Sequence, residues 1–388
     1  MAETFSVTEL IIPGTYIRVQ SEGLIRAGGV SSGNIGIVGT ARKRQLDANG
    51  QPAVDGEGNP LFDNSIYGST VVLSDFATAQ ARFGTYDPYR NASGAVVGTL
   101  HLVRSLQLIY ENGGKTVFAR ALPTNQATRN DFAAAFAELL KDDINIVIAP
   151  ELSQTDALAV FGPLLEAAEN DGKDLIAVVG ADVNLTQLST FLAGVPNNDR
   201  LILTTPGIVG FDSAAAADVN LPGSYTAAAV AGLLSSLAPQ VSPTNKPLPG
   251  VTKLVQRFSY GETKQLVGGR VMILEERQGG GRVVRGITTD TGAFKQVTTR
   301  RITDAAKAGI RQASEPFIGR LNNARVRGAL RSAIASFLDA MVADEALIKY
   351  TLEVTATRDD EIAGRAIVNA VIQPTFSIDF IAVTLVLQ

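Results

Sequence analysis

The sequence predicts a multi-domain protein of α/β and α+β class: a middle α/β layer, a C-terminal α+β domain, and an extended strand-like arm at each end. Three observations support this. Apolar strands alternate with helices over 130–240, four prolines interrupt the pattern within 238–250, and period-two apolar runs occupy both ends of the chain. At 388 residues, with 45% hydrophobic and 19% charged residues, the chain is long enough for two or three domains.

The middle of the chain repeats a helix and an apolar strand three times. Near-continuous apolar strands are typical of a parallel sheet that helices cover on both faces. The expected helices span 131–140, 153–170 and 184–194, and the strands that follow them span 144–149, 175–180 and 201–205. A further helix over 224–237, with Ser224 as the expected N-cap, closes this layer.

Elements before this layer belong to the same predicted domain, which spans 23–250. They are a glycine-spaced strand at 33–39, an amphipathic helix at 99–110 that ends at Asn112-Gly113-Gly114, and a strand at 117–120. Turn-forming residues at 47–50 and 55–60 predict an exposed hairpin or loop over 41–70. The domain is expected to end at 250 because prolines cannot continue a regular element.

The C-terminal domain is predicted to span 251–375. It begins with an irregular segment rich in arginine. A strong helix follows, and two strands are expected at 350–357 and 367–372. The helix is indicated by apolar residues at helical spacing, namely Leu330, Ile334, Phe337, Leu338 and Met341.

The two arms, 1–22 and 376–388, carry apolar residues at strand spacing. An unpaired strand exposes backbone N–H and C=O groups, so each arm is expected to pair with a sheet. Two possibilities stay open: an ordinary strand in the chain's own sheet, or a strand donated to another copy. The candidate inter-subunit residues are Phe5, Val7, Ile11, Tyr16, Ile17 and Val19, with Phe376, Ile378, Phe380, Val383 and Leu385.

Charge is uneven along the chain, although the net charge is only −4. Between 270 and 331 there are thirteen basic and five acidic residues, a balance of +8, whereas 339–379 has a balance of −5. These segments are either solvated faces with internal ion pairs or complementary surfaces that meet between copies or with an acidic partner. Nucleic acid is not supported, because only Phe294 and Phe317 in the basic segment could stack on bases.

Candidate catalytic and ligand motifs fail on inspection. The run Gly113-Gly114-Lys115-Thr116 lacks the earlier glycine of a phosphate-binding loop and ends a helix instead of opening one. The acidic turn 55–60 has proline and isoleucine where a calcium loop needs glycine and glutamate. With no cysteine and only His101, which we interpret as structural, we expect no enzyme, no cofactor and no metal site. The sequence also lacks a secretory signal pattern and an apolar run long enough to span a membrane, so we expect neither secretion nor membrane insertion.

The competing interpretation is an α/β nucleotide-binding module or enzyme, based on the three helix–strand repeats. Fold alone does not separate the two. In a doubly wound sheet, ligands bind beyond the carboxyl ends of the strands. The expected strand ends, Pro150, 180–182 and 205–207, offer one carboxylate and neither histidine nor lysine, which is a poor catalytic set.

The order of several short motifs resembles that of contractile tail sheath proteins from phages and related injection systems, over nearly the whole chain. One departure is Leu108-Ile109-Tyr110, where the family has an aromatic run. The matching motifs are Pro13-Gly14-Thr15-Tyr16, the strand 35–41, Ser74-Asp75-Phe76, Arg82-Phe83-Gly84, Asn112-Gly113-Gly114, the strand 117–120, the small-residue helix at 222–232 and Asn322-Asn323.

This resemblance implies a structural subunit that polymerises around an inner tube and contracts to drive the tube through a target envelope, with arms that add strands to neighbouring sheets. It implies a helical homopolymer of hexameric rings in a virion tail assembled in the host cytoplasm. The implied partners are an inner tail tube protein, baseplate proteins and tail terminator proteins. Together with the charge count, it suggests Arg320, Arg325, Arg327 and Arg331 as tube-facing residues. A capsid or inner-tube subunit shares this assembly logic and remains an alternative.

Overall fold

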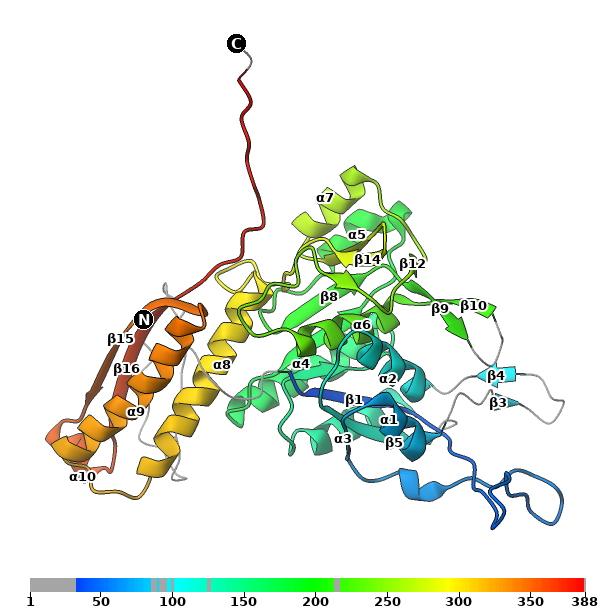
Figure 1. Cartoon of the computed structure of the whole chain (residues 1–388), viewed down its shortest axis with the longest axis horizontal. Coiled ribbons are helices and arrows are strands. Elements are labelled where there is room, and N and C mark those ends of the chain that lie inside the picture. The colour runs from blue at the N-terminus through cyan, green and yellow to red at the C-terminus, as the bar shows by residue number, and fades with distance from the viewer. Residues whose placement is uncertain are drawn as a thin grey trace. The chain divides into compact units, whose positions relative to one another are not determined.

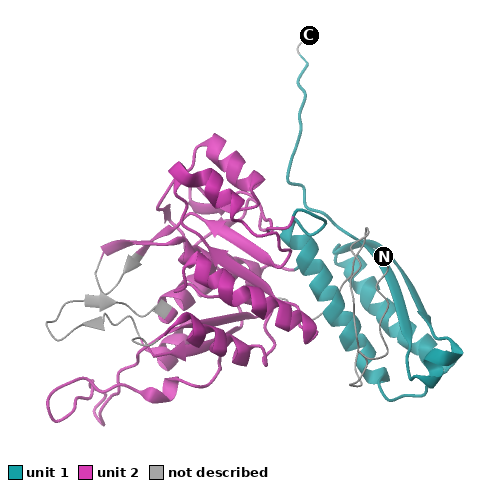
Figure 2. Cartoon of the chain, turned by 180° about the vertical axis from the view of Figure 1, so that it is seen from behind, with its two compact units in different colours: residues 1–32, 239–242, 291–388 teal, residues 33–238, 243–290 magenta. Residues whose placement is uncertain are grey.

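The computed structural model describes residues 33–84, 89–90, 96–98, 101–123, 127–212 and 217–386. Chain contacts divide the molecule into two compact units (Figure 2). Unit 2 contains 33–238 and 243–290, and the described part of unit 1 contains 239–242 and 291–386. The predicted mixed, multi-domain fold class is confirmed.

The largest sheet of unit 2 has nine strands within the described part of the chain, and Figure 1 shows how they are arranged. They are β1 Ile35–Thr40, β2 Val71–Leu73, β5 Val117–Leu122, β6 Ile146–Ile148, β7 Ile176–Gly180, β8 Leu201–Thr205, β11 Pro247–Leu248, β13 Met272–Arg277 and β14 Gly280–Val283. Their order in space is β11-β14-β13-β8-β7-β6-β1-β5-β2. The six strands from β13 to β5 are parallel, and the antiparallel β2, β14 and β11 lie at the edges.

Helices cover both faces of this sheet. They are α1 Phe76–Phe83, α2 His101–Glu111, α3 Arg129–Leu139, α4 Gln154–Asn170, α5 Leu188–Ala193, α6 Gly223–Ser236 and α7 Tyr260–Gly268. Val147, Ala177 and Leu203 share one hydrophobic core with α3 and α4. Because neighbouring residues of a strand point to opposite faces, the alternate strand residues face α2 and α6. Burial on both faces explains why β6, β7 and β8 are buried at every position and mostly apolar.

Smaller elements complete unit 2. A three-stranded antiparallel sheet contains β9 Ile208–Asp212, β10 Ala217–Leu221 and β12 Lys253–Leu254, and β3 Tyr89–Arg90 pairs with β4 Val96–Gly98. Two short 3-10 helices, Asn64–Ile66 and Leu185–Gln187, precede β2 and α5.

The segment predicted as an exposed hairpin or loop, 41–70, contains a small closed triangle of backbone hydrogen bonds. Gln45 N donates to Leu61 O (2.9 Å), Ala53 N to Gln45 O (2.9 Å), and Leu61 N to Ala53 O (3.0 Å). Asp47 and Asp55 each hold a turn, because one carboxylate oxygen accepts from the N–H groups two and four positions further along. These hydrogen bonds lower the pKa of Asp55. The Asp55 carboxylate therefore stabilises the turn in which it lies.

Two differences from the sequence prediction concern unit 2. Residues 243–290 lie in this unit, although the sequence placed the boundary at 250, because β13 pairs with β8 and extends the parallel sheet past the proline-rich stretch. Helix α6 begins at Gly223 with Pro222 as N-cap, not Ser224. The Asp182 carboxylate accepts the Gly223 N–H (2.8 Å), so a distant side chain supplies the cap.

Unit 1 packs two helices on a hairpin. Its elements are α8 Val297–Ser314, the short 3-10 helix Glu315–Phe317, α9 Ala324–Ala343, β15 Leu347–Thr355, α10 Arg358–Ile362 and β16 Ile367–Pro374. Among the described residues, β15 and β16 form a two-stranded antiparallel sheet. Ile302 of α8, Ile334 and Leu338 of α9, and Leu347 and Ile372 of the hairpin share one core. This hairpin presents one face to the helices and leaves the other exposed.

Helix α8 occupies the segment that the sequence predicted to be irregular. Its buried residues include Thr299, Arg300, Arg301 and Thr303. Polar residues at buried positions hide the apolar period from which a helix is recognised. The same burial shows that the charge balance of +8 over 270–331 does not describe a solvated basic surface, since Arg300, Arg301 and Lys307 are buried.

Candidate assembly surface

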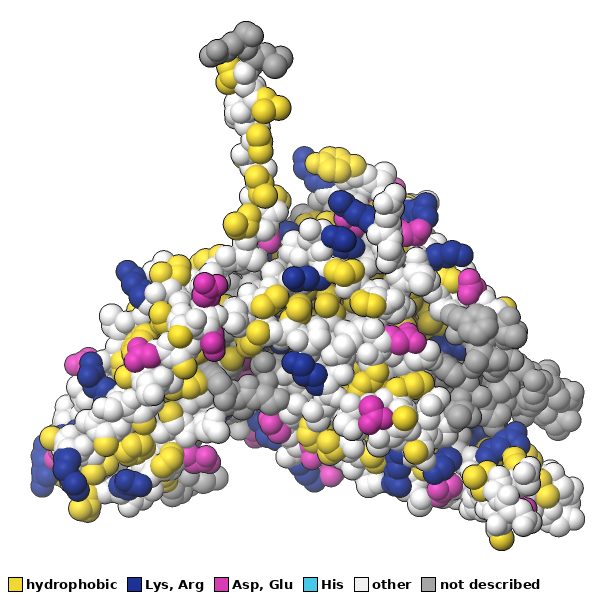
Figure 3. Space-filling view, in the orientation of Figure 1, with side chains coloured by type: hydrophobic (Ala, Val, Ile, Leu, Met, Phe, Trp, Pro, Cys, Tyr) yellow, Lys and Arg dark blue, Asp and Glu magenta, His cyan; other side chains and the backbone are white. Residues whose placement is uncertain are grey.

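The C-terminal arm extends away from unit 1 without joining a sheet (Figure 1). Strand β16 ends at Pro374, Thr375 N donates to Ala346 O (3.1 Å), and no regular secondary structure follows as far as residue 386. Apolar side chains run along the arm (Figure 3). The exposed fractions are 56% for Phe376, 81% for Ile378, 75% for Phe380, 84% for Ile381, 74% for Val383 and 86% for Leu385.

An arm of this composition is far more apolar than solvent-exposed chain usually is. The sequence predicted a strand over 376–388, and within the isolated chain the described part of this segment belongs to no strand. The seven residues from Phe380 to Val386 would span about 23 Å when extended, which is long enough for an average strand. The N-terminal candidates Phe5, Val7, Ile11, Tyr16, Ile17 and Val19 lie outside the described residues.

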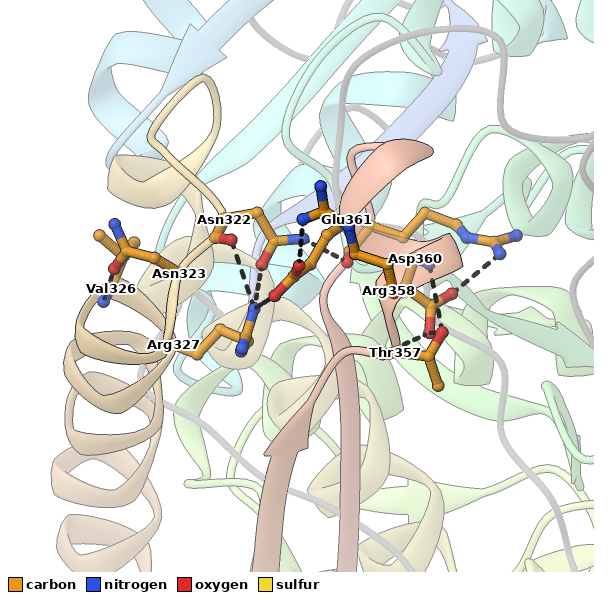
Figure 4. A network of polar contacts seen from close by, with 9 residues as sticks. Asn322, Asn323, Val326, Arg327, Thr357, Arg358, Asp360 and Glu361 are labelled. Atoms are coloured by element: carbon orange, nitrogen blue, oxygen red, sulfur yellow. Dashed lines mark hydrogen bonds and ion pairs between the residues drawn. The ribbon is translucent and has the colours of Figure 1, made fainter.

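At the other end of the β15–β16 hairpin, α10 and the start of α9 are joined by a polar network (Figure 4). Arg327 Nη1 donates to Asn322 Oδ1 (2.8 Å) and contacts Glu361 Oε1 (3.0 Å). Arg358 Nη1 donates to Glu361 Oε2 (3.0 Å), and Asn322 Nδ2 donates to Arg365 O (2.7 Å). Hydrogen bonds from Arg358 and then Arg327 lower the pKa of Glu361.

The four predicted tube-facing arginines differ in their surroundings, because only Arg327 belongs to this network. The Arg327 side chain is 16% exposed and is occupied within its own domain. Arg320 and Arg325 are exposed, with Arg320 lying over the Phe317 ring at 5.3 Å. Arg331 is also exposed, although its Nε donates to Leu352 O (3.3 Å). Arg320, Arg325 and Arg331 therefore offer their charge to solvent, and Arg327 ties α9 to α10.

The carboxyl ends of the parallel strands in unit 2 are where an α/β enzyme would bind a ligand. Strand β1 lies between β5 and β6 at this point. Glu151, which follows β6 and which the sequence prediction omitted, accepts from Thr40 N (2.6 Å) and Thr40 Oγ1 (2.7 Å). Asp182 caps α6, and Thr205 Oγ1 donates to Ala181 O (2.9 Å). These polar groups are therefore all engaged in hydrogen bonds that stabilise unit 2.

The remaining ligand motifs also have structural roles. Gly113 has a φ of +88°, and Gly114 N donates to Ile109 O (2.9 Å), so this glycine pair ends α2 ahead of β5. Among the described residues, no group of three His, Asp or Glu side chains is placed to hold a metal ion. The helices of the described part of the chain include none long and apolar enough to cross a membrane.

Burial raises the pKa of Glu151 to about 7, against an ordinary value of 4.5. The folded protein therefore keeps a proton that the unfolded chain has released, and this contribution to the unfolding free energy declines as pH rises from 4.5 to 7. Glu151→Gln keeps both contacts to Thr40 without the titration. Between pH 4.5 and pH 7, the free energy of unfolding of the wild type should fall by about 1–3 kcal/mol relative to that of this variant. Above pH 7 the difference between the two proteins should stay constant, as measured by urea unfolding. A constant difference across this range would contradict the assignment.

Residues 289–388 match the family of phage tail sheath C-terminal domains. Over the whole chain, the contracted helical sheath of the anti-feeding prophage superposes with a TM-score of 0.69 at 18% identity, covering 97% of this chain and 99% of that one. The chain has the sheath fold. The contracted sheath of the extracellular contractile injection system PVC gives a TM-score of 0.69 at 16% identity, with coverage of 99% and 98%. The sheath tail protein of Desulfitobacterium hafniense gives 0.61 at 13%, with coverage of 93% and 100%.

These matches confirm the resemblance to sheath proteins predicted from the sequence motifs. The sheath fold is also found in the anti-feeding prophage baseplate, with a TM-score of 0.71 at 17% identity over 97% of this chain and 99% of that one. No curated protein sequence matches this chain. At these identities, the comparison with solved structures establishes the sheath fold, and assembly must be argued from this chain's own surface.

Proposed function

We propose that the protein is a structural subunit of a contractile tail sheath, which polymerises around an inner tube and contracts to drive the tube through a target envelope. The observation that carries the proposal is the arm 376–386, which holds a row of exposed apolar side chains on a chain with the sheath fold. An unpaired apolar strand is an aggregation liability unless another sheet receives it.

The receiving site in this proposal is the β15–β16 sheet of a neighbouring copy. Among the described residues this sheet has two strands, and a two-stranded sheet is marginal by itself. Adding an arm would pair backbone groups at its edge, in the manner of strand addition. Because such a link depends on the arm and not on the position of the domain bodies, it would persist while the bodies rotate during contraction.

The assembly that follows is a helical homopolymer of hexameric rings, assembled in the host cytoplasm and located in a virion tail or a related injection device. Its further partners would be the inner tube, the baseplate and the tail terminator. The baseplate is supported by the matching fold in the anti-feeding prophage baseplate. The test is negative-stain electron microscopy of the purified full chain. Hollow, obliquely striated tubes are expected, and a chain that stays monomeric at high concentration and in precipitating salt would overturn the proposal.

The exposed Arg325 and Arg331 are the charge contacts that we propose for an acidic tube surface. Reversing both to Glu should prevent assembly on purified tubes and still permit free sheath tubes, as checked by co-sedimentation and microscopy. Arg327 is kept, because reversing it would break its ion pair with Glu361 and disturb the fold. Normal co-sedimentation of the double variant with tubes would rule out these contacts.

A further inference from the structure

The root of the C-terminal arm, residues 375–379, has its polar face toward unit 1 and its apolar face outward. Thr375, Ser377 and Asp379 are half-buried, whereas Phe376 and Ile378 are exposed. In an ordinary edge strand the apolar face would be the buried one. A slip of one residue would exchange the two faces. Some contact must therefore fix which face of the arm points outward.

Next to the backbone hydrogen bond from Thr375 N to Ala346 O, the side chain of Gln296 makes such a contact. Its Nε2 donates to Ser377 O (3.4 Å), and its Oε1 accepts from Ser377 N (3.3 Å). One side-chain amide thus pairs with both backbone groups of one residue, as a neighbouring strand would. Gln296 Nε2 also contacts Asp379 Oδ2 (3.3 Å), and Ser377 Oγ donates to Asp379 Oδ1 (3.2 Å).

The position of Gln296 in the fold strengthens this assignment. It is the N-cap residue of α8, but its side chain makes no capping hydrogen bond. Glutamine is not among the preferred N-cap residues, which are Ser, Thr, Asp and Asn. The amide is directed to the arm instead of to the first turn of its own helix. Helix α8 packs into the unit 1 core through Ile302, so Gln296 is attached to a rigidly packed helix.

We propose that Gln296 is a positioning residue that clamps the root of the C-terminal arm and sets its outward face for strand donation. This inference rests on the proposed function for its purpose, but the clamp itself is a property of the single subunit. Beyond Asp379 the described part of the arm belongs to no regular secondary structure, and the clamp at Ser377 lies directly before the exposed run from Phe380 to Val386. A preset direction lowers the ordering cost when a neighbour's sheet receives the arm.

The test uses the absence of cysteine in the chain. A nitroxide attached to Ile378→Cys, next to the clamp, reports arm motion in dilute full-length protein by electron paramagnetic resonance. In the Gln296→Ala background the released fraction should rise roughly 5- to 30-fold, because two hydrogen bonds to the arm backbone are lost. Gln296→Glu should release the arm at least as fully, since it removes the donor to Ser377 O and brings a carboxylate to Asp379.

Two controls separate the clamp from general destabilisation. Gln312→Ala removes an exposed glutamine near the other end of α8 and should leave the Ile378→Cys spectrum unchanged. A label at Leu385→Cys should be mobile in every background, because it lies beyond the clamp. An unchanged Ile378→Cys spectrum in both Gln296 variants would overturn the inference. A released arm in a protein whose wild type forms no tubes would uphold the clamp and defeat the proposed function.

Discussion

Removing residues 376–388 is expected to abolish tube formation and leave a folded, monomeric protein. The described part of this segment contributes no strand and no member of the hydrophobic cores around α3 and α4 or around α8 and α9, so the fold does not depend on it. In the polymer it would bury several apolar side chains that the monomer exposes. Burying only Ile381, Val383, Leu385 and Val386 is worth roughly 6–12 kcal/mol per subunit before ordering costs.

The measurement combines circular dichroism, sedimentation and negative-stain microscopy of the truncated chain. Its melting temperature should match that of the wild-type monomer, whereas tubes should be absent at every concentration. A synthetic peptide of residues 376–388 should inhibit assembly of the wild type by competing for the receiving sheet, and a scrambled peptide should not. Tubes formed by the truncated chain would show that body contacts suffice and that the arm is not the link.

Secondary structure was predictable where the buried positions are occupied by apolar residues, because their spacing along the sequence then reveals the element. Strands β6, β7 and β8 are buried at every position because both faces are covered, and apart from Thr204 and Thr205 their residues appear in sequence as apolar runs. Helix α9 was found from the spacing of Leu330, Ile334 and Leu338, which lie in the unit 1 core. Helix α8 was missed because it buries threonine and arginine beside Ile302.

The candidate assembly surface was predictable only in part. The C-terminal arm could be found from the sequence, because its apolar residues at strand spacing lie close together along the chain. Glu151, Gln296 and the Arg327–Glu361 pair could not, since each acts on a residue far along the chain. Glu151 had one local signal, a carboxylate just after a buried strand and Pro150. The only local signal for Gln296 was weak: glutamine is a poor N-cap residue, and the helix that it begins was not predicted from the sequence.

The second large effect is expected at Gly180, the last residue of β7. A Cβ placed there would lie 1.8 Å from Gly223 O, and a Cβ on Gly223 would lie 2.2 Å from Ala181 O. The backbone of β7 and the start of α6 thus approach closely because neither residue has a side chain. Both partners are backbone atoms in the buried layer of unit 2, so no side chain can turn away to make room.

Gly180→Ala should therefore destabilise unit 2 by about 3 kcal/mol or more, the upper part of the range for overpacked cores. In a unit of this size that corresponds to a fall in melting temperature of roughly 6–12 °C, measured by thermal unfolding of the dilute monomer. Gly261→Ala is the matched control, because Gly261 lies in α7 of the same unit with nothing within 4 Å of an added Cβ. That change should be neutral or stabilising by up to about 1 kcal/mol. Equal melting temperatures for the two variants would mean that β7 and α6 can separate at little cost, and would contradict the close backbone contact as a source of stability.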